Sequence, residues 1–571
     1  MTDEDSGEED NVEIDNVPPS QVNAPALLEV VNIPFDEQKS NICENENTEE
    51  LSKTVSIEQK THKRKNRDLL LSTRSTQLSE KKKKSFNWKI NSDLETILED
   101  WPLMLTVPNI EKTPLEYFEL FFDEDVINMI VTYTNQYAAK RNRLGDCSES
   151  EMKSFLCVLL LSGYNTVSRR EMYWEQSSDC HNPLVVEALS RDRFRFIMQN
   201  LHVCNNDELD HKDRFAKIRP LLVKINQRCK SFMPHHQNHS IDESMVPYFG
   251  RHGTKQFIRG KPIRYGFKFW CGGPSNGYLV WLEPYQGSGT LPPQYANYGL
   301  GYGVVMTYAD TLEKMPYTFY FDNFFTSFQL LSDLKQRGIN ATGTIRSNRF
   351  GKGCPISESK TVKKKPRGSM EYASDHDSGL LLVSWNDNSV VNIATNSDTV
   401  HPLRHVQRYS QERKEKISVP QPKLIHNYNT SMGGIDRADQ NISLYRVSIR
   451  GKKWYFPLIA HLLDVSVQNA WQLHRQDGGK LDQLAFRRRI VLAVLEGNKR
   501  VVSGRGRPST SSKIDSRYDR IDHIVSDIEN DPRTGKKKQL HCRLCHKKAT
   551  TKCMKCEVPL HVTCFLHYHT K

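Results

Sequence analysis

The sequence has 571 residues, of which 37% are hydrophobic, and a formal net charge of +12 at pH 7. No window approaches the roughly 20 unbroken apolar residues of a membrane-spanning helix, so no membrane association is expected. The length leaves room for roughly three or four domains, and the excess of basic residues favours a polyanionic partner bound with salt-sensitive affinity.

Residues 1–109 form a region whose charge changes sign along the chain. The first 50 or so residues are rich in Asp and Glu and poor in aromatic side chains, which predicts a disordered acidic tail. Between residues 60 and 85 the runs H-K-R-K-N-R and K-K-K-K are strongly basic. Such runs are typical of nuclear import signals or nucleic-acid contacts, with a solvated linker as the alternative. We therefore expect a nuclear protein.

Residues 110–237 repeat apolar side chains at helical spacing. The pattern is clearest in residues 114–134 and 150–164. Ser148 or Ser150 suits the N-cap of the second helix. Residues 454–500 are also predicted to be helical. From the residues alone these segments indicate a helical bundle.

Residues 238–349 predict an α/β unit. Three β-prone runs are followed by a helix candidate, a fourth strand in P-Y-T-F-Y-F-D, an amphipathic segment at 327–339 and a fifth strand in A-T-G-T-I-R. Gly338 is a suitable C-cap for the amphipathic segment. The resulting β-β-β-α-β-α-β order is that of an RNase H-like nuclease core.

Acidic residues occur at several positions in this unit and in the segment after it. Asp242 lies on the first strand and Asp322 ends the fourth, whereas Asp436 and Asp439 follow a Gly-Gly at i, i+3 spacing, so one helical face can hold both. A single such Asp is most often a cap or turn residue. Converging carboxylates indicate a Mg²⁺ or Mn²⁺ site, and two such ions can activate a nucleophile and stabilise the leaving oxygen in phosphoryl transfer.

Two segments after the fifth strand have their own character. Residues 350–424 begin with a lysine-rich run and continue with alternating apolar and polar residues, which predicts a β-rich insertion. Residues 501–540 form a basic linker that contains R-G-R-P, the core of a peptide that lies in A/T-rich minor grooves. Arg505 and Arg507 are therefore candidate DNA contacts, with a plain flexible linker as the alternative.

Cysteine and histidine residues crowd into residues 541–571. Eight of them suit two tetrahedral Zn²⁺ sites: Cys542, Cys545, Cys553, Cys556, His561, Cys564, His567 and His569. The ligand order of RING and PHD-like domains predicts a cross-brace, with one set made of Cys542, Cys545, His561 and Cys564 and the other of Cys553, Cys556, His567 and His569. His541 and His546 are substitute ligands. Disulfides are disfavoured, because no signal peptide is expected and the basic clusters point to a reducing compartment.

The blocks S-I-D-E-S-M, F-D-N-F-F-T-S and M-G-G-I-D-R-A-D-Q resemble those of DDE transposases of the piggyBac superfamily, and more narrowly of piggyBac transposable element-derived proteins. The resemblance extends over residues 110–571. It implies that Asp242, Asp322 and Asp436 are catalytic acids and that Asp439 is a further acid beside the metals. None of these acids is replaced.

The same resemblance implies roles beyond the acids. Trp454 occupies the family's aromatic position behind the third acid, and Arg346 and Arg349 fall where the family has basic residues that face DNA. From the residues alone, core packing explains Trp454, with stacking on a nucleobase as the alternative. Solvated surface explains the arginines, with a phosphate contact near the acids as the alternative. The family usually has Cys where His561 stands. Its helical segments form a dimerization and DNA-binding domain, and its Cys-rich tail recognises terminal inverted repeats, which implies a homodimer on double-stranded DNA.

Together these patterns predict an RNase H-like core with a β-rich insertion, a split helical domain and a zinc-binding tail. The expected boundaries are 1–109 for the N-terminal region, 110–237 and 446–500 for the helical domain, 238–349 and 425–445 for the catalytic core, 350–424 for the insertion, 501–540 for the linker and 541–571 for the tail.

Three function classes fit these patterns. The first, an active DNA transposase acting at TTAA targets, uses all the features. The second is a domesticated nuclear DNA- or chromatin-binding protein without transposition activity. The third, a chromatin reader or ubiquitin-ligase-like adaptor that acts through its zinc tail, explains only the tail.

Overall fold

The computed structural model describes residues 86–95, 100–102, 112–259, 261–351, 353–411, 413–499, 523–531 and 535–570. The predicted acidic tail, the basic runs, Arg505 and Arg507 lie outside these residues. Within the described ranges, no helix is both long and apolar enough to cross a membrane.

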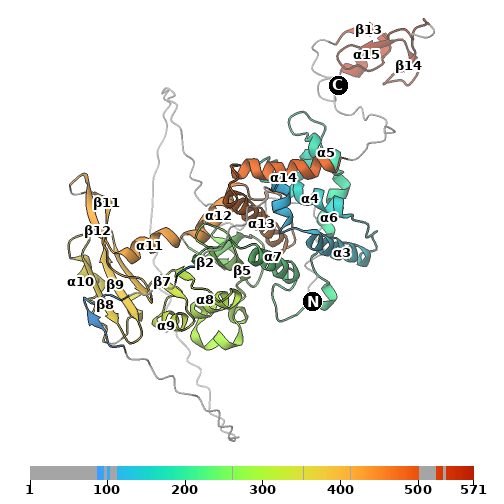
Figure 1. Cartoon of the computed structure of the whole chain (residues 1–571). Coiled ribbons are helices and arrows are strands. Elements are labelled where there is room, and N and C mark those ends of the chain that lie inside the picture. The colour runs from blue at the N-terminus through green and yellow to red at the C-terminus, as the bar shows by residue number, and fades with distance from the viewer. Residues whose placement is uncertain are drawn as a thin grey trace, which may run out of the picture. The chain divides into compact units, whose positions relative to one another are not determined.

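A mixed β-sheet forms the centre of the protein (Figure 1). Its elements follow one another as β2 (Asn238–Pro247), β4 (Tyr265–Pro274), β5 (Trp281–Pro284), α8 (Leu300–Thr311), β6 (Thr318–Phe321), α9 (Phe328–Gln336) and β7 (Asn340–Thr344), with a short β3 (Gln256–Phe257) against β4. The spatial order is β5-β4-β2-β6-β7, antiparallel from β5 to β2 and parallel from β2 to β7. The predicted order of strands and helices is confirmed.

Local sequence explains the parallel part of this sheet. Phe319, Tyr320 and Phe321 of β6 are all buried, as expected for a central strand covered on both faces. Ser327 caps the start of α9 by accepting a hydrogen bond from the Leu330 N–H. Beyond the end of α9, Gly338 has a φ of +74°, so the predicted glycine stop is confirmed.

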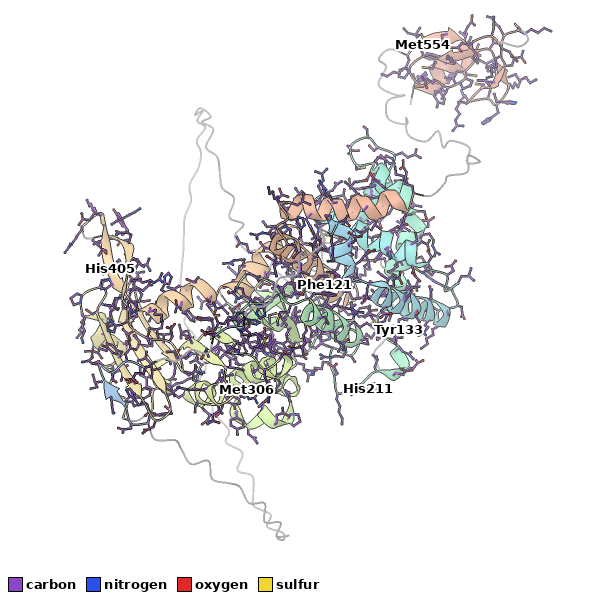
Figure 2. All side chains as sticks on the ribbon, viewed as in Figure 1. Phe121, Tyr133, His211, Met306, His405 and Met554 are labelled. Atoms are coloured by element: carbon purple, nitrogen blue, oxygen red, sulfur yellow. The ribbon has the colours of Figure 1, made fainter. Side chains whose placement is uncertain are left out.

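The insertion continues the same sheet. Its elements are α10 (Ser359–Lys363), β8 (Met370–Asp375), β9 (Leu380–Asn386), β10 (Val390–Thr395), β11 (Arg404–Ser410) and β12 (Glu415–Gln421). Strand β10 pairs antiparallel with β7, where Ile393 lies opposite Thr344, and β1 (Lys89–Ile90) pairs with β8 at the far edge. Strands β11 and β12 form a separate two-stranded ribbon, on which Figure 2 labels His405. The predicted β-rich character is confirmed, but the insertion shares the central sheet because β7 offers it an open edge.

Helices from both ends of the folded region form one bundle. Those before the sheet are α2 (Pro114–Glu119), α3 (Glu124–Lys140), α4 (Glu149–Ser162), α5 (Pro183–Ala188), α6 (Arg191–Asn200) and α7 (Arg219–Ser231), and those after it are α13 (Phe456–Gln476) and α14 (Gln483–Gly497). Helix α13 packs on α2 and α7, and α14 packs on α2, α4 and α5. Phe121 is buried inside this bundle (Figure 2). Ser148 forms a capping box with Glu151, so of the two candidates Ser148 is the N-cap of α4.

A buried ion pair joins α13 to α14. The guanidinium of Arg487 donates to Asp464 Oδ1 at 2.6 Å and to the Leu160 carbonyl oxygen at 3.1 Å, and both charged side chains are almost fully buried. The Val447 N–H donates to the other carboxylate oxygen of Asp464. Removing one partner of such a pair leaves an uncompensated buried charge.

We therefore expect Arg487→Met to lower the free energy of unfolding by about 3–5 kcal/mol. Arg488→Met is the matched control, because Arg488 is the next residue of α14 and is exposed. Denaturant unfolding of both variants and of the wild-type protein measures the difference. An unfolding midpoint of the Arg487 variant equal to that of the control would contradict a stabilising role for the ion pair.

The Cys/His-rich module is a small fold with its own core. It consists of β13 (Val525–Asp527) paired with β16 (Thr551–Cys553), β14 (Leu540–His541) paired with β15 (Lys548–Ala549), and α15 (Val562–His569). Its buried core contains few apolar side chains besides the cysteines, among them Ala549 and Leu560. The pairing of β13 with β16 means that the module starts before residue 541, where the sequence placed its beginning.

Candidate active site and metal-binding module

Asp242 lies within β2 and Asp322 directly follows the end of β6, at the same level of these two neighbouring parallel strands. In the register of β2 with β6, Ile241 lies opposite Phe321, and each is followed directly by one of the acids. Asp242 Oδ1 accepts a hydrogen bond from the Glu243 N–H, and Asp322 is held by the turn after β6. Residues far apart in the sequence are thus brought side by side by strand pairing.

Two helices follow the insertion, α11 (Lys423–Ser431) and α12 (Gly434–Leu444), and α12 lies against β2. Gly434 approaches β2 so closely that a Cβ there would overlap Ser240 Oγ. Further along α12, Asp439 Oδ1 accepts a hydrogen bond of 2.6 Å from Ser244 Oγ. Ser240 and Ser244 share one face of β2 with Asp242, because strand side chains alternate. Helix α12 therefore covers the face that carries the first acid.

Asp436 lies on α12 between these two contacts. Its charge raises the pKa of both Asp242 and Asp439, which places the three carboxylates in one electrostatic group. The predicted i, i+3 relation of Asp436 and Asp439 on one helix is confirmed. Asp242 is buried and Asp436 is exposed, so the group runs from the sheet interior to solvent, and the half-buried Asp322 lies beside Asp242 through the strand register.

Burial is the main influence on the acidity of these groups. It raises the pKa of Asp242 well above its usual range, with Glu243 and Asp436 adding to the effect. It also raises the pKa of Asp322, and it raises that of Asp439 to about 6. Carboxylates held together in this way repel one another when ionised. A cation between them would relieve the repulsion and keep them ionised.

Three residues that sequence reasoning missed surround the acids. Glu243 forms ion pairs with Lys261 at 3.5 Å and with Lys268 at 3.8 Å. Burial lowers the pKa of Lys261, but the nearby carboxylates, Asp242 and Glu243 foremost, outweigh it and raise that pKa. Lys268 lies 3.9 Å from the ring centre of Trp270. Only the adjacency of Glu243 to Asp242 was visible in the sequence.

The chemistry of the donors suits a hard divalent cation, because all are carboxylate oxygens. Among the residues that the structure describes, only the Cys/His groups of the module bring three or more ligand atoms within 4.8 Å of one another. The carboxylates are thus spaced more widely than the ligands of a single closed site. Such spacing suits ligands distributed around two ions, which lie about 4 Å apart in two-metal sites.

Arg349 holds the loop that follows Asp322. Its Nη1 donates to three main-chain carbonyl oxygens of residues 323–326, at distances of 2.6 to 3.2 Å. Arg346 donates to Asn323 Oδ1 at 2.8 Å, remains exposed, and its charge opposes the rise in the pKa of Asp322. The structure therefore gives Arg349 a loop-positioning role and leaves Arg346 exposed beside the acid. Their contact with DNA stays a prediction.

Trp454 is half-buried in an aromatic cluster. Its ring centre lies 4.3 Å from that of His252 and 6.0 Å from that of Phe267. The ring of Tyr455 meets it edge-on. These contacts account for an aromatic residue here by packing, and the predicted stacking on DNA is not tested by them.

The module gathers two groups of metal-binding side chains. One group is Cys542, Cys545, His561 and Cys564, and the other is His523, Cys553, Cys556 and His569. In the first group, His561 Nδ1 lies 3.2 Å from Cys545 Sγ. Burial raises the pKa of Cys542, but hydrogen bonds from main-chain N–H groups outweigh it and lower that pKa to about 6, which favours the thiolate. The groups alternate along the chain, as in a cross-brace. Each suits one tetrahedral Zn²⁺.

The second group differs from the prediction at one position. His567 is exposed and belongs to neither group, and His523 takes its place, with Nδ1 3.4 Å from Cys553 Sγ. Residues two apart on a helix point to nearly opposite sides, so α15 cannot direct both His567 and His569 at one ion. His541 Nδ1 is engaged with the His546 carbonyl oxygen at 2.8 Å. The apolar, β-prone residues Ile524, Val525 and Ile528 after His523 were the signal that this segment belongs to the fold.

Comparison with known proteins identifies the class to which this protein belongs. Residues 113–471 match the Transposase IS4 family, so the protein contains a DDE-type transposase domain. The chain belongs to the piggyBac transposable element-derived protein family. It is 47% identical over 468 residues to the human PiggyBac transposable element-derived protein 3, a match that covers 81% of this chain and 77% of the relative.

A second relative agrees with this assignment, and a solved structure has a similar fold. The human PiggyBac transposable element-derived protein 2 is 42% identical, with 81% of this chain and 77% of the relative covered. The fold is similar to that in a cryo-EM structure of a piggyBac transposase synaptic complex with hairpin DNA, with a TM-score of 0.59 at 22% identity. That match covers 80% of this chain and 96% of the other, which supports a mixed α/β fold of the piggyBac transposase type.

Proposed function

We propose that this protein is a DNA transposase that cleaves and joins DNA strands with Mg²⁺ or Mn²⁺ held by Asp242, Asp322 and Asp436. The observation that carries this proposal is the register of β2 with β6, which sets Asp242 beside Asp322. Helix α12 packs on β2 and brings the charge of Asp436 to Asp242. The bound ions would activate the attacking oxygen and stabilise the leaving one.

The protein's own residues have distinct tasks in this proposal. Asp242, buried at the sheet centre, anchors the site. Asp436, an exposed residue on α12, completes the site from the solvent side. Asp439, fixed by Ser244, keeps α12 at its distance from β2. Arg349 fixes the loop after Asp322, so that this carboxylate keeps its place during the reaction.

The fold supports the proposal that the core of this protein is RNase H-like. The sheet order β5-β4-β2-β6-β7 with mixed direction is the one expected for that core. In this proposal α2–α7 together with α13 and α14 are the split helical domain that mediates dimerization and DNA binding, and β8–β12 are the insertion. We keep the boundaries predicted from the sequence for this proposal, except that the zinc module includes His523.

The proposed partner is double-stranded DNA, and the proposed compartment is the nucleus. The piggyBac transposase to which the fold is similar was seen in a synaptic complex with hairpin DNA. We propose that the protein acts as a homodimer, that its Zn²⁺ module recognises the terminal inverted repeats, and that TTAA is the target. Exposed Arg346 beside Asp322 supports a phosphate contact close to the chemistry.

The test is a cleavage assay with purified full-length protein. The substrate is a plasmid that carries the inverted repeats flanking the gene, bordered by TTAA. Cleavage at those ends that depends on added Mg²⁺ or Mn²⁺ is expected. Specific binding without cleavage at any metal concentration would favour the second candidate, a domesticated DNA- or chromatin-binding protein. The human relatives are named as transposable element-derived proteins, which favours keeping that candidate.

We expect Asp439→Ala to keep activity but to raise the required Mn²⁺ concentration by about 10–100-fold, as loss of a supporting carboxylate does. Because burial raises the pKa of Asp439 to about 6, its support is lost as the pH falls through 6. The apparent Mn²⁺ affinity of the wild-type protein should therefore fall between pH 7 and pH 5. A metal titration of Asp439→Ala that matches the wild type at both pH values would remove Asp439 from the site.

A further inference from the structure

A cavity of about 620 Å³ lies beside the acids and is not part of their site. It is bounded by the end of β2 and the residues after it (246–250), by the loop 446–452, and by the first turns of α13. Its walls are mostly apolar, with Val246, Ile449 and Phe456 among them. Protein cavities of this size accept ligands as large as a nucleotide.

His461, on α13, is an unsatisfied polar group in the wall of this cavity. The residue is 3% exposed, and neither of its ring nitrogens has a hydrogen-bond partner. Burial, with a contribution from Arg446, lowers its pKa to about 3, so the ring is neutral at physiological pH. A neutral imidazole offers one donor and one acceptor. Leaving both unused in a buried place is unfavourable, and a ligand with a matching polar edge would offset that cost.

Arg446 supplies a cationic donor to the same cavity. It is half-buried, and within the described residues its guanidinium forms no hydrogen bond or ion pair. The carboxylate of Asp464, whose charge acts most strongly on Arg446, is already engaged by Arg487 and by the Val447 N–H. The charge of Arg446 also acts on Asp439, which shows that the cavity borders the acidic group. These donors suit an anionic ligand close to the reaction site.

The rim of the cavity is aromatic and basic. Phe249 lines it although its side chain is 56% exposed, and Tyr248 is its neighbour. Arg450 and Lys452 are exposed at the loop side of the cavity. An aromatic platform beside cationic side chains is the arrangement with which proteins hold an unstacked base and its phosphate.

We propose that this cavity binds one extrahelical nucleotide of DNA, with its base among the apolar walls, its polar edge on His461 and its phosphate on Arg446. This inference rests on the proposed function, because it takes DNA as the substrate. Turning one nucleotide out of the duplex next to the acids would expose the adjacent phosphate to them. The neutral ring of His461 can satisfy the donor and acceptor atoms on the edge of a base.

The test compares the affinity of full-length protein for a fully paired duplex and for the same duplex with one mismatched pair, without added Mg²⁺ or Mn²⁺. A mismatched base costs less to unstack, so the wild-type protein should bind the mismatched duplex about tenfold more tightly. Phe249→Ala and His461→Phe should abolish this preference and leave binding of the paired duplex unchanged. Phe257→Ala is the matched control, since Phe257 is also 56% exposed but lies on β3, outside the cavity.

Each possible result of this test supports or overturns the inference about the cavity. Equal affinity of the wild-type protein for both duplexes, or a preference that persists in both Phe249→Ala and His461→Phe, overturns the inference while the proposed function stands. Thermal stabilisation by dAMP without any duplex preference assigns the cavity to a free nucleotide and also overturns it. Failure to bind either duplex overturns both the inference and the proposed function. Because Phe249 is a surface side chain, its variant answers the question even if His461→Phe does not fold.

Discussion

Asp242→Asn, Asp322→Asn and Asp436→Asn are each expected to lower metal-dependent strand cleavage by about 10³-fold or more, which corresponds to about 4 kcal/mol of lost transition-state stabilisation. Asn keeps the shape of the side chain but removes the charge that holds a divalent cation. Binding to DNA should stay close to that of the wild type, because basic residues elsewhere supply it. The measurement is cleavage of a plasmid that carries the element's ends, alongside affinity for the same ends.

The control for these variants is Asp192→Asn. Asp192 is exposed on α6, away from the acidic group, so the same chemical change there should leave cleavage unaffected. Cleavage at the wild-type rate by any one of the three acid variants would remove that residue from the proposed metal site. Loss of DNA binding together with cleavage would instead point to misfolding, which a thermal unfolding curve of each variant checks.

Removal of Zn²⁺ is expected to have a large effect on the folding of the Cys/His-rich module. Residues 523–570 bury few apolar side chains, so we expect the two ions to supply most of the folding free energy, and a chelator should unfold the module while the sheet and the bundle stay folded. End-specific DNA binding should be lost with it, and salt-sensitive binding to random duplex should remain. Elemental analysis, circular dichroism and competition binding measure these changes.

The ligand set allows a sharper version of this experiment. His523→Ala should lower the zinc content from about two ions per chain to about one, whereas His567→Ala should leave it at about two, because only His523 lies in a ligand group. The two variants remove the same side chain from the same module. Equal zinc content in both would refute the assignment of His523. End-specific binding that survives complete loss of Zn²⁺ would move recognition of the DNA ends to the helical bundle.

Several elements of the sheet and of the helical bundle could be predicted because their signals are local. The apolar run of β6, the cap at Ser148 and the glycine at 338 each act within a few residues of themselves. The i, i+3 spacing of Asp436 and Asp439 needed only the assumption of a helix. Recognising that the acids converge required more, since the pairing of β2 with β6 joins residues 80 positions apart, and it came from the family resemblance.

The features that sequence missed depend on three-dimensional neighbours. His523 belongs to the zinc module because β13 pairs with β16, across a separation that ligand spacing does not show. Lys261 lies among the carboxylates through the folding of the chain between β3 and β4. The family resemblance implied that Arg349 faces DNA, but the carbonyl oxygens that it engages lie in a loop more than 20 residues earlier.

The split bundle has a consequence for how the protein is made. Helices α2 and α4 leave the ribosome with their apolar faces uncovered, and their partners α13 and α14 begin almost 300 residues after the end of α4. At roughly 5–20 residues per second, translation takes about 15–60 s to supply those partners. During that interval the uncovered apolar faces of α2 and α4 can cause aggregation, and we expect chaperones to bind them. Truncation before α13 should therefore yield insoluble protein even though every residue of the acidic group is present.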